Sequence, residues 1–129
     1  MIATVFLIMM SLYAFAPVNE VLYLERPDEI NYYDRLINAV AQVESKGNIF
    51  AMNWKELAAG PLQIRPVRIN HYNKLTGSNY TIVDCFDLEL SRKVFLYFCQ
   101  GKSYSQAAKD WNGSGPMTID YWNLVKAEL

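Results

Sequence analysis

A glutamate at the end of an apolar helical stripe is the residue of this sequence best suited to do chemistry. Over Asp28 to Lys46, apolar residues recur at helical spacing, which predicts an amphipathic helix with Glu44 in its last turn. Glu44 follows Val40 by one helical turn and therefore lies on the apolar face. A carboxyl group in that setting is partly desolvated, which raises its pKa and suits it to general acid catalysis. The alternative is that the helix ends at Glu44 and the side chain reaches water.

The elements that must position Glu44 are also predicted to be helices. Asp28 is a suitable N-cap for the first helix, and Gly47 with Asn48 is a suitable stop. Further helices are expected over residues 67–75, 88–99 and 117–129, and a capping-box pattern at Ser103 opens another. The 88–99 segment is apolar nearly all round, which predicts a central buried helix. Only residues 20–24 and 62–64 have any strand character, so the expected fold class is mainly α, with short loop and β elements.

Composition limits the classes of function. A chain of 129 residues, of which 52% are hydrophobic, is expected to form one domain with a real core. The net charge is −1, and no run of Lys or Arg provides the electrostatic footprint of a nucleic-acid-binding protein. Nucleic acid is therefore excluded as a partner. An anionic polymer would have to be recognised by local groups and not by a global positive field.

The N-terminal residues differ in character from the rest. Residues 1–16 carry no charge, and Ala14-Phe15-Ala16 has the small-x-small form of a signal-peptide cleavage site. No basic residue precedes the apolar run, and Pro17 would directly follow the cut. We therefore expect residues 1–17 to be a secretory signal or a membrane anchor, residues 18–27 a connector, and residues 28–129 the folded domain. A third hypothesis is that the apolar segment is a buried element of a larger assembly.

The cysteines and the histidine give no sign of a metal or disulfide. Cys85 and Cys99 would be about 20 Å apart if both lay on one helix, which is far beyond disulfide reach. We expect two buried free thiols. The chain has a single histidine, His71, and no Cys-x-x-Cys pair, so neither a metal site nor a cofactor is expected.

Three short segments combine Glu44 with further polar and aromatic residues. They are Val43-Glu44-Ser45, Gly60-Pro61-Leu62-Gln63 with the following Ile64-Arg65-Pro66, and Trp111-Asn112-Gly113, followed by Tyr121 and Val125. In order and approximate spacing they resemble the signature segments of lysozyme-like lytic transglycosylases, the superfamily that includes soluble lytic transglycosylases and goose-type lysozymes. That family has Glu-Ser at a helix end, then Gly-Leu-Met-Gln, then Ala-Tyr-Asn before a glycine. The Gln-Ile-Arg-Pro variant is similar to small cell-wall lysis domains of Bacteroidetes and their phages.

The resemblance implies a lysozyme-like helical domain that cleaves the glycan strands of peptidoglycan, with Glu44 as the catalytic acid. The substrate-binding residues that it implies are Ser45, Gln63, Trp111, Asn112 and Tyr121. Each has a structural alternative, as a helix-end, loop or core residue. Trp54 is a further candidate for stacking on a sugar ring. The implied location is the cell envelope, facing the wall, or a virion if the chain is phage-encoded; the oligomeric state is left open.

Two departures from the family pattern leave the mechanism open. Pro61 and Leu62 stand where the family has Leu and Met, which stiffens the loop but keeps an apolar wall. No second carboxylate is obvious, and the candidates are Glu56, Asp84, Asp87 and Asp110. A two-carboxylate hydrolase, or muramidase, would need one of these facing Glu44, whereas a lytic transglycosylase would not. Two further hypotheses are a non-catalytic wall-binding or virion-assembly module and a membrane-anchored helical domain.

Overall fold

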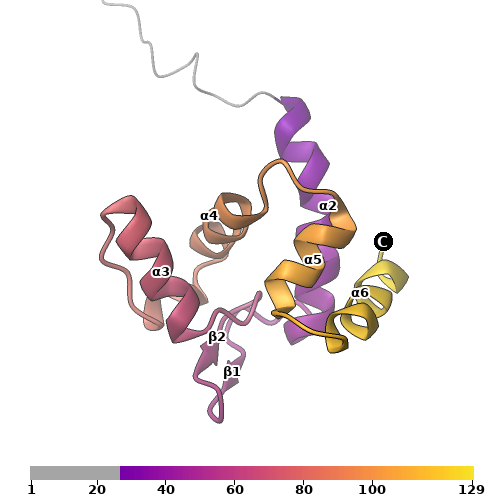
Figure 1. Cartoon of the computed structure of the whole chain (residues 1–129). Helices are drawn as coiled ribbons and strands as arrows, with labels where there is room; N and C mark the ends of the chain where they lie inside the picture. The colour runs from indigo at the N-terminus through magenta and orange to yellow at the C-terminus, as the bar shows by residue number, and fades with distance from the viewer. Residues whose placement is uncertain (1–26) are drawn as a thin grey trace, which may run out of the picture. The chain divides into compact units, whose positions relative to one another are not determined.

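Five α-helices and one short antiparallel hairpin make up the part of the chain that the computed structural model describes, residues 27–129, with side chains from residue 32 onward. In chain order the elements are α2 (Pro27–Ser45), β1 (Met52–Asn53), β2 (Ala58–Ala59), α3 (Pro66–Thr76), the 3-10 helix η2 (Val83–Phe86), α4 (Leu88–Cys99), α5 (Tyr104–Asn112) and α6 (Met117–Ala127) (Figure 1). The predicted mainly α class is confirmed. Residues 31–129 form one unit by their contacts.

Helices α3 to α6 begin within one residue of the positions that local sequence signals predicted, whereas α2 begins at Pro27, so the predicted N-cap Asp28 lies inside that helix. Pro66 occupies the start of α3. Asp87 caps α4 by accepting a hydrogen bond from the Leu90 amide, and Ser103 caps α5 by accepting one from the Gln106 amide. Each cap satisfies an amide that has no partner within its helix. The capping box at Ser103 is only half formed, because the Gln106 side chain donates instead to Asp110, one turn further along α5.

The core lies where α2, α4 and α5 meet. Its large fully buried side chains include Leu36 and Val40 from α2 and Val94 and Phe95 from α4. The prediction of a central buried helix over residues 88–99 holds for only one face of α4. Leu88 and Tyr97 are 44% and 45% exposed. The Tyr97 ring packs edge-on against Tyr72 of α3, 5.2 Å between centroids, so this apolar residue covers a neighbouring helix and does not enter the core.

Both cysteines are free and buried, as predicted. Cys85 lies in η2 and Cys99 ends α4. Burial raises the pKa of each thiol to about 12. Thiols held protonated in this way are poor nucleophiles, so both act as small apolar side chains.

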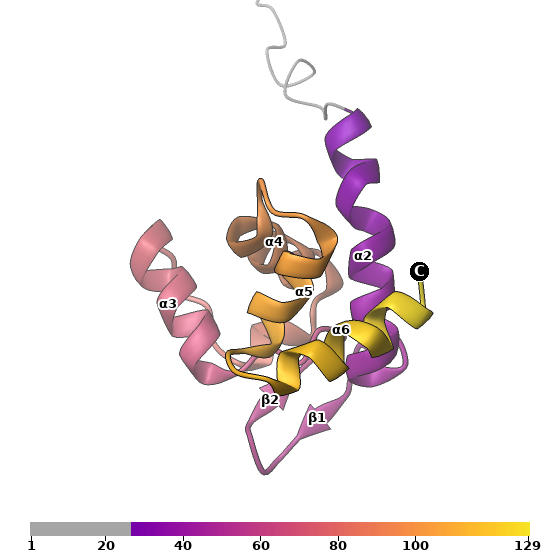
Figure 2. The same cartoon turned by 45° about the vertical axis from the view of Figure 1, so that its right-hand side comes forward.

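The hairpin is the element that the sequence did not predict. Met52 pairs with Ala59 and Asn53 with Ala58, and Ile64 adds an isolated bridge to Ala59. Only this bridge falls within the predicted strand-like stretch 62–64. Both views place the hairpin at the C-terminal end of α2, near the start of α6 (Figure 2). Glu44 is therefore at the end of α2 where the hairpin and α6 converge.

The predictions for the N-terminus fall on residues 1–26 and so lie outside the described residues. A signal or anchor over residues 1–17, a connector over 18–27 and strand character at 20–24 stay predictions, except that Pro27, the last connector residue, already belongs to α2. None of the helices within residues 27–129 combines the length and apolar character that crossing a membrane requires.

Candidate functional site

Glu44 and Tyr121 form a direct side-chain pair at the end of α2. The Tyr121 hydroxyl, which α6 contributes, donates a hydrogen bond of 2.7 Å to Glu44 Oε1, and Tyr121 is only 8% exposed. Burial raises the pKa of Glu44; the Tyr121 hydrogen bond and the positive charge of Arg65 act in the opposite direction, and Glu56 adds to the rise. The predicted desolvation of Glu44 is confirmed. Glu44 is half-buried and lines a pocket, so its side chain also keeps access to solvent.

Replacing Tyr121 by Phe is expected to raise the pKa of Glu44 further, because the hydroxyl stabilises the charged carboxylate. The phenyl ring keeps the packing, so the fold should be retained. The measurement is an NMR titration of the Glu44 side-chain carboxyl carbon in the wild type and in Tyr121→Phe. A midpoint that stays in place or falls in the variant would show that the hydrogen bond does not form in solution. Tyr80→Phe, which removes a hydroxyl elsewhere, is the control.

Ser45 joins the end of α2 to the loop that follows the hairpin. Its hydroxyl lies 2.8 Å from the carbonyl oxygen of Pro61 and 3.1 Å from that of Ala41. Ser45 is not among the residues that line the pocket beside Glu44. The structure therefore gives Ser45 a positioning contact, because it fixes the loop that carries Gln63 against the helix that carries Glu44.

Gln63 is held in an uncommon backbone conformation, with φ at 49°. Its amide nitrogen donates to the carbonyl oxygens of Gly60, at 3.0 Å, and Ala51, at 3.2 Å. Two carbonyl acceptors on one side settle which end of the amide is nitrogen. The amide oxygen is then the end that can accept a hydrogen bond from a ligand in the pocket that Gln63 lines.

The end of α5 contributes Trp111 and Asn112. Trp111 is 6% exposed, packs on Phe95 with 4.8 Å between centroids, and donates from its indole nitrogen to the Leu62 carbonyl at 3.2 Å. Trp111 is thus mainly a core residue that braces the loop before Gln63. Asn112 is half-buried, ends α5 and lines the pocket, so its helix-terminating role and a ligand-binding role coexist.

These segments enclose a pocket of about 280 Å³. It is lined by Glu44, Asn53, Glu56, Gln63, Ile64, Arg65, Val67, Arg68, Trp111, Asn112 and Gly113. Four of the six predicted site residues therefore share one pocket. Tyr121 is linked to the pocket by its hydrogen bond to Glu44, whereas Ser45 does not line the pocket. Trp54 is 77% exposed in the hairpin loop and is not part of the lining.

Sequence reasoning gave no pocket role to Asn53, Arg65 or Arg68, and it named Glu56 only as one of four candidates for a second carboxylate. Asn53 and Glu56 come from the hairpin, which has too few residues per strand to produce an alternating pattern. Arg65, the extended N-cap residue of α3, and Arg68, in the first turn of that helix, are three residues apart in the sequence. That spacing was the available signal for a basic pair beside Gln63.

Glu56 provides a second carboxylate in the pocket of Glu44. Its side chain is 45% exposed and forms an ion pair with Arg65, with 3.2 Å between nitrogen and oxygen. The other three candidates have structural roles elsewhere. Asp84 accepts hydrogen bonds from Thr81, Asp87 caps α4, and Asp110 pairs with Lys102 at 2.7 Å.

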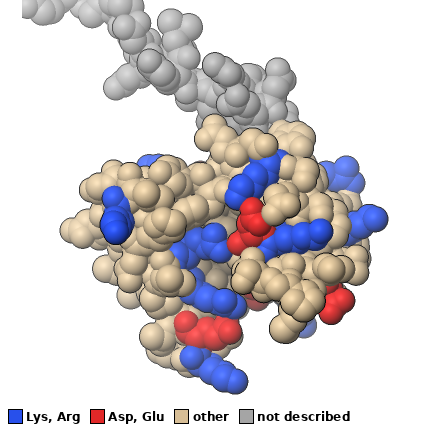
Figure 3. All heavy atoms as spheres, in the orientation of Figure 1, with Lys and Arg blue, Asp and Glu red and all other residues tan. Residues whose placement is uncertain are grey.

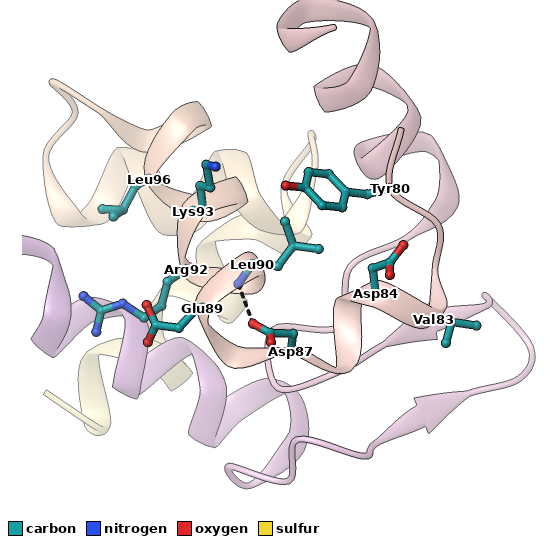
Figure 4. A pocket seen from close by; sticks show the side chains of 9 residues that line it. All are labelled: Tyr80, Val83, Asp84, Asp87, Glu89, Leu90, Arg92, Lys93 and Leu96. Carbon is teal, nitrogen blue, oxygen red and sulfur yellow. Dashed lines mark hydrogen bonds between the residues drawn. The ribbon is translucent and has the colours of Figure 1, made fainter. Parts of the chain in front are cut away.

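A second hollow, of about 770 Å³, contains none of the predicted site residues. It lies along α4 and the preceding turn, and Figure 4 shows its side chains (Figure 4). Asp84 accepts hydrogen bonds from Thr81, Asp87 caps α4, and Arg92 pairs with Asp34 at 2.6 Å, whereas Glu89 and Lys93 are exposed. Three of its charged side chains are therefore already engaged within the protein. Within residues 27–129, no three His, Cys, Asp or Glu side chains gather in a way that could hold a metal ion.

Comparison with known proteins adds no family assignment. No protein-family model matches the sequence, and no curated protein or solved structure is detectably similar to it. The chemistry of the pocket is therefore the basis for assigning a function.

Proposed function

We propose that this protein cleaves the β-1,4 glycosidic bond between N-acetylmuramic acid and N-acetylglucosamine in peptidoglycan, with Glu44 as the general acid. The observation that carries the proposal is the desolvated Glu44 carboxyl, hydrogen-bonded by Tyr121 and lining one pocket with Gln63 and Asn112. The three motif segments supply these four residues. The proposal includes a lysozyme-like arrangement, in which a helix carries the acid and a hairpin borders the pocket.

The raised pKa of Glu44 suits the first half of the reaction. The protonated carboxyl transfers its proton to the glycosidic oxygen as the bond from that oxygen to C1 of the muramic acid breaks. The carboxylate that remains is stabilised by the Tyr121 hydroxyl. It then takes the proton from the C6 hydroxyl of the same sugar, whose oxygen bonds to C1 and closes a 1,6-anhydro ring. The scheme uses no metal ion and no organic cofactor.

Gln63 and Asn112 would hold the sugar for this step. The Gln63 amide nitrogen is fixed by two loop carbonyls, so its oxygen has a defined direction. Asn112 ends α5, and the carbonyls of the two residues before it accept hydrogen bonds from Arg68. Donors and acceptors with fixed positions reduce the entropy lost when a substrate is oriented. The pocket itself has a volume near the lower end of the range for ligand sites.

The experiment is digestion of purified peptidoglycan by the full chain, with mass spectrometry of the soluble products. The expected products are muropeptides that end in 1,6-anhydro-muramic acid. Reducing-end products would identify a hydrolase, and the absence of soluble products with retained wall binding would identify a non-catalytic wall-binding or assembly module. The proposal also places the protein in the cell envelope or in a virion, with membrane attachment through residues 1–16. The digest does not test these points; fractionation of the full chain does.

Hydrolysis is the second candidate, because Glu56 lines the same pocket as Glu44. In a muramidase with an inverting or retaining mechanism, the second carboxylate activates water or attacks the sugar. The test is Glu56→Gln. For the lytic transglycosylase, we expect less than about a tenfold loss of activity and unchanged anhydro products, because Glu56 is half exposed and paired with Arg65. For the hydrolase, the loss should approach the 10²- to 10⁴-fold typical of an acid or base residue.

A further inference from the structure

One basic side chain in the pocket has no acidic partner among the described residues. Arg65 pairs with Glu56 and Lys102 with Asp110, but Arg68 forms no ion pair with any carboxylate in that part of the chain. Basic side chains gather in the middle of the face shown in Figure 3 and down toward the hairpin, with acidic ones beside them (Figure 3). The chain as a whole is not basic, so any positive potential at the pocket is local.

The position of Arg68 is fixed by its neighbours. One guanidinium nitrogen, Nη2, donates to the carbonyls of Asp110 at 3.2 Å and Trp111 at 2.8 Å. The guanidinium carbon also lies 4.4 Å from the centre of the Trp111 ring and 5.2 Å from that of Phe98. Backbone acceptors and aromatic rings together hold the planar cation in one orientation.

The other side of the guanidinium remains available. Nη1 and Nε donate no hydrogen bond to the described residues. Neither of these two nitrogens is fully buried. Arg68 lines the pocket that contains Glu44, so these nitrogens can reach solvent there. Unused N–H groups of a guanidinium can donate charge-assisted hydrogen bonds to a carboxylate. Burial lowers the pKa of Arg68 although the negative charge of Asp110 acts in the opposite direction, as expected for a partly desolvated cation.

We propose that Arg68 is an anion-binding group of this pocket and that it binds a carboxylate carried by the muramic acid residue of the substrate. This inference rests on the proposed function. The carboxylate has two sources, the lactyl group of a peptide-free muramic acid or the stem peptide attached to that group. The subsite would make the pocket selective for muramic-acid-containing glycans over neutral polymers of N-acetylglucosamine.

The test is ligand binding to the full chain carrying Glu44→Gln, measured by isothermal titration calorimetry. The probes are a peptide-free tetrasaccharide of alternating N-acetylglucosamine and N-acetylmuramic acid, its lactyl methyl ester, the same tetrasaccharide with stem peptides, and chitotetraose. We expect the free acid to bind about tenfold or more tighter than its ester and chitotetraose, as a charge-assisted hydrogen bond implies. If only the peptide-bearing probe shows this gain, the stem peptide is the source of the carboxylate.

Variants distinguish ligand binding by Arg68 from its structural role, which is to hold the carbonyls at the end of α5. Arg68→Gln should remove the preference for the acid while chitotetraose binding stays the same, and Arg68→Lys should restore part of it. Lys74→Gln, which removes one positive charge from an exposed position on the same helix, is the control. The comparison of acid, ester, peptide-bearing probe and chitotetraose needs no Arg68 variant, so it is decisive even if Arg68→Gln unfolds.

Equal binding of acid and ester, with no gain for the peptide-bearing probe either, would overturn the Arg68 inference and leave the proposed function standing. An acid preference that survives in folded Arg68→Gln would also overturn it. Conversely, carboxylate-selective binding combined with a wild-type chain that cleaves nothing would refute the proposed activity and keep the anion subsite. Failure of all four saccharides to bind would overturn both.

Discussion

Replacing Glu44 by Gln is expected to reduce peptidoglycan cleavage by about 10²- to 10⁴-fold, the usual contribution of a general acid. The amide has nearly the shape of the carboxyl group, and its oxygen can still accept the hydrogen bond from Tyr121. It cannot deliver a proton to the glycosidic oxygen. Rates of release of soluble muropeptides, measured for wild type and variant at one pH, provide the comparison. Glu128→Gln, at an exposed position after α6, is the matched control and should keep full activity.

The same substitution is expected to leave the free energy of unfolding unchanged or to increase it near neutral pH. The pKa of Glu44 is higher in the folded protein than in the unfolded chain, mainly because of burial. Glu44 therefore favours folding below its unfolded pKa, and this contribution is lost as pH rises through the folded pKa. Gln stays neutral throughout, so the variant should lack that pH-dependent loss. Urea unfolding at several pH values measures the difference.

The pair of results distinguishes a catalytic glutamate from a structural one. A residue that only holds the fold should lower both stability and activity when it is replaced. A variant with full wall-cleaving activity would refute the assignment of Glu44 as the acid. A variant that is inactive and also less stable at neutral pH would indicate that the charged carboxylate helps to hold the end of α2, contrary to the direction of its pKa. Cleavage by the wild type should fall as pH rises through the pKa of Glu44, because only the protonated form donates.

The helices could be predicted because their signals are local. Periodicity, Pro66 at the start of α3 and Ser103 before α5 are each read within one or two turns of chain. The exposed face of α4 could not be predicted in this way. Leu88 and Tyr97 are apolar whether or not a neighbour covers them, so composition alone cannot tell the outer face of this helix from its inner face.

The candidate site was only partly predictable for the same reason. Glu44 stood out because a charged residue on an apolar helical face is locally unusual. Gln63 and Asn112 stood out only through the motif resemblance. Glu56 and Arg68 enter the pocket through tertiary contacts, since the hairpin folds back and Arg68 binds the carbonyls of residues more than forty positions away along the chain. No pattern within a short window reports such pairings.

A steric constraint that the sequence does not reveal requires glycine at the first position of the Gly-Pro-Leu-Gln segment. Gly60 has φ of +81°, in the left-handed region, and a Cβ placed there would lie 1.8 Å from the carbonyl oxygen of Cys85 and 2.8 Å from its carbonyl carbon. That oxygen also accepts a hydrogen bond of 3.0 Å from Ser91, inside α4. Because both chain segments are fixed, neither can move aside without breaking contacts in the core.

Gly60→Ala is therefore expected to destabilise the protein by about 4 kcal/mol or more, or to prevent folding, since it combines a backbone clash with an unfavourable φ. Gly77→Ala separates the two effects, because Gly77 has φ of +69° but open space around the position of a Cβ. That variant should lose only about 1–2 kcal/mol. Urea unfolding of both variants and the wild type is the measurement. Similar losses for the two would mean that strain in φ, and not the approach of Gly60 to Cys85, requires the glycine. A folded Gly60→Ala protein should also cleave less, since the displaced loop carries Gln63 and the Pro61 carbonyl that Ser45 holds.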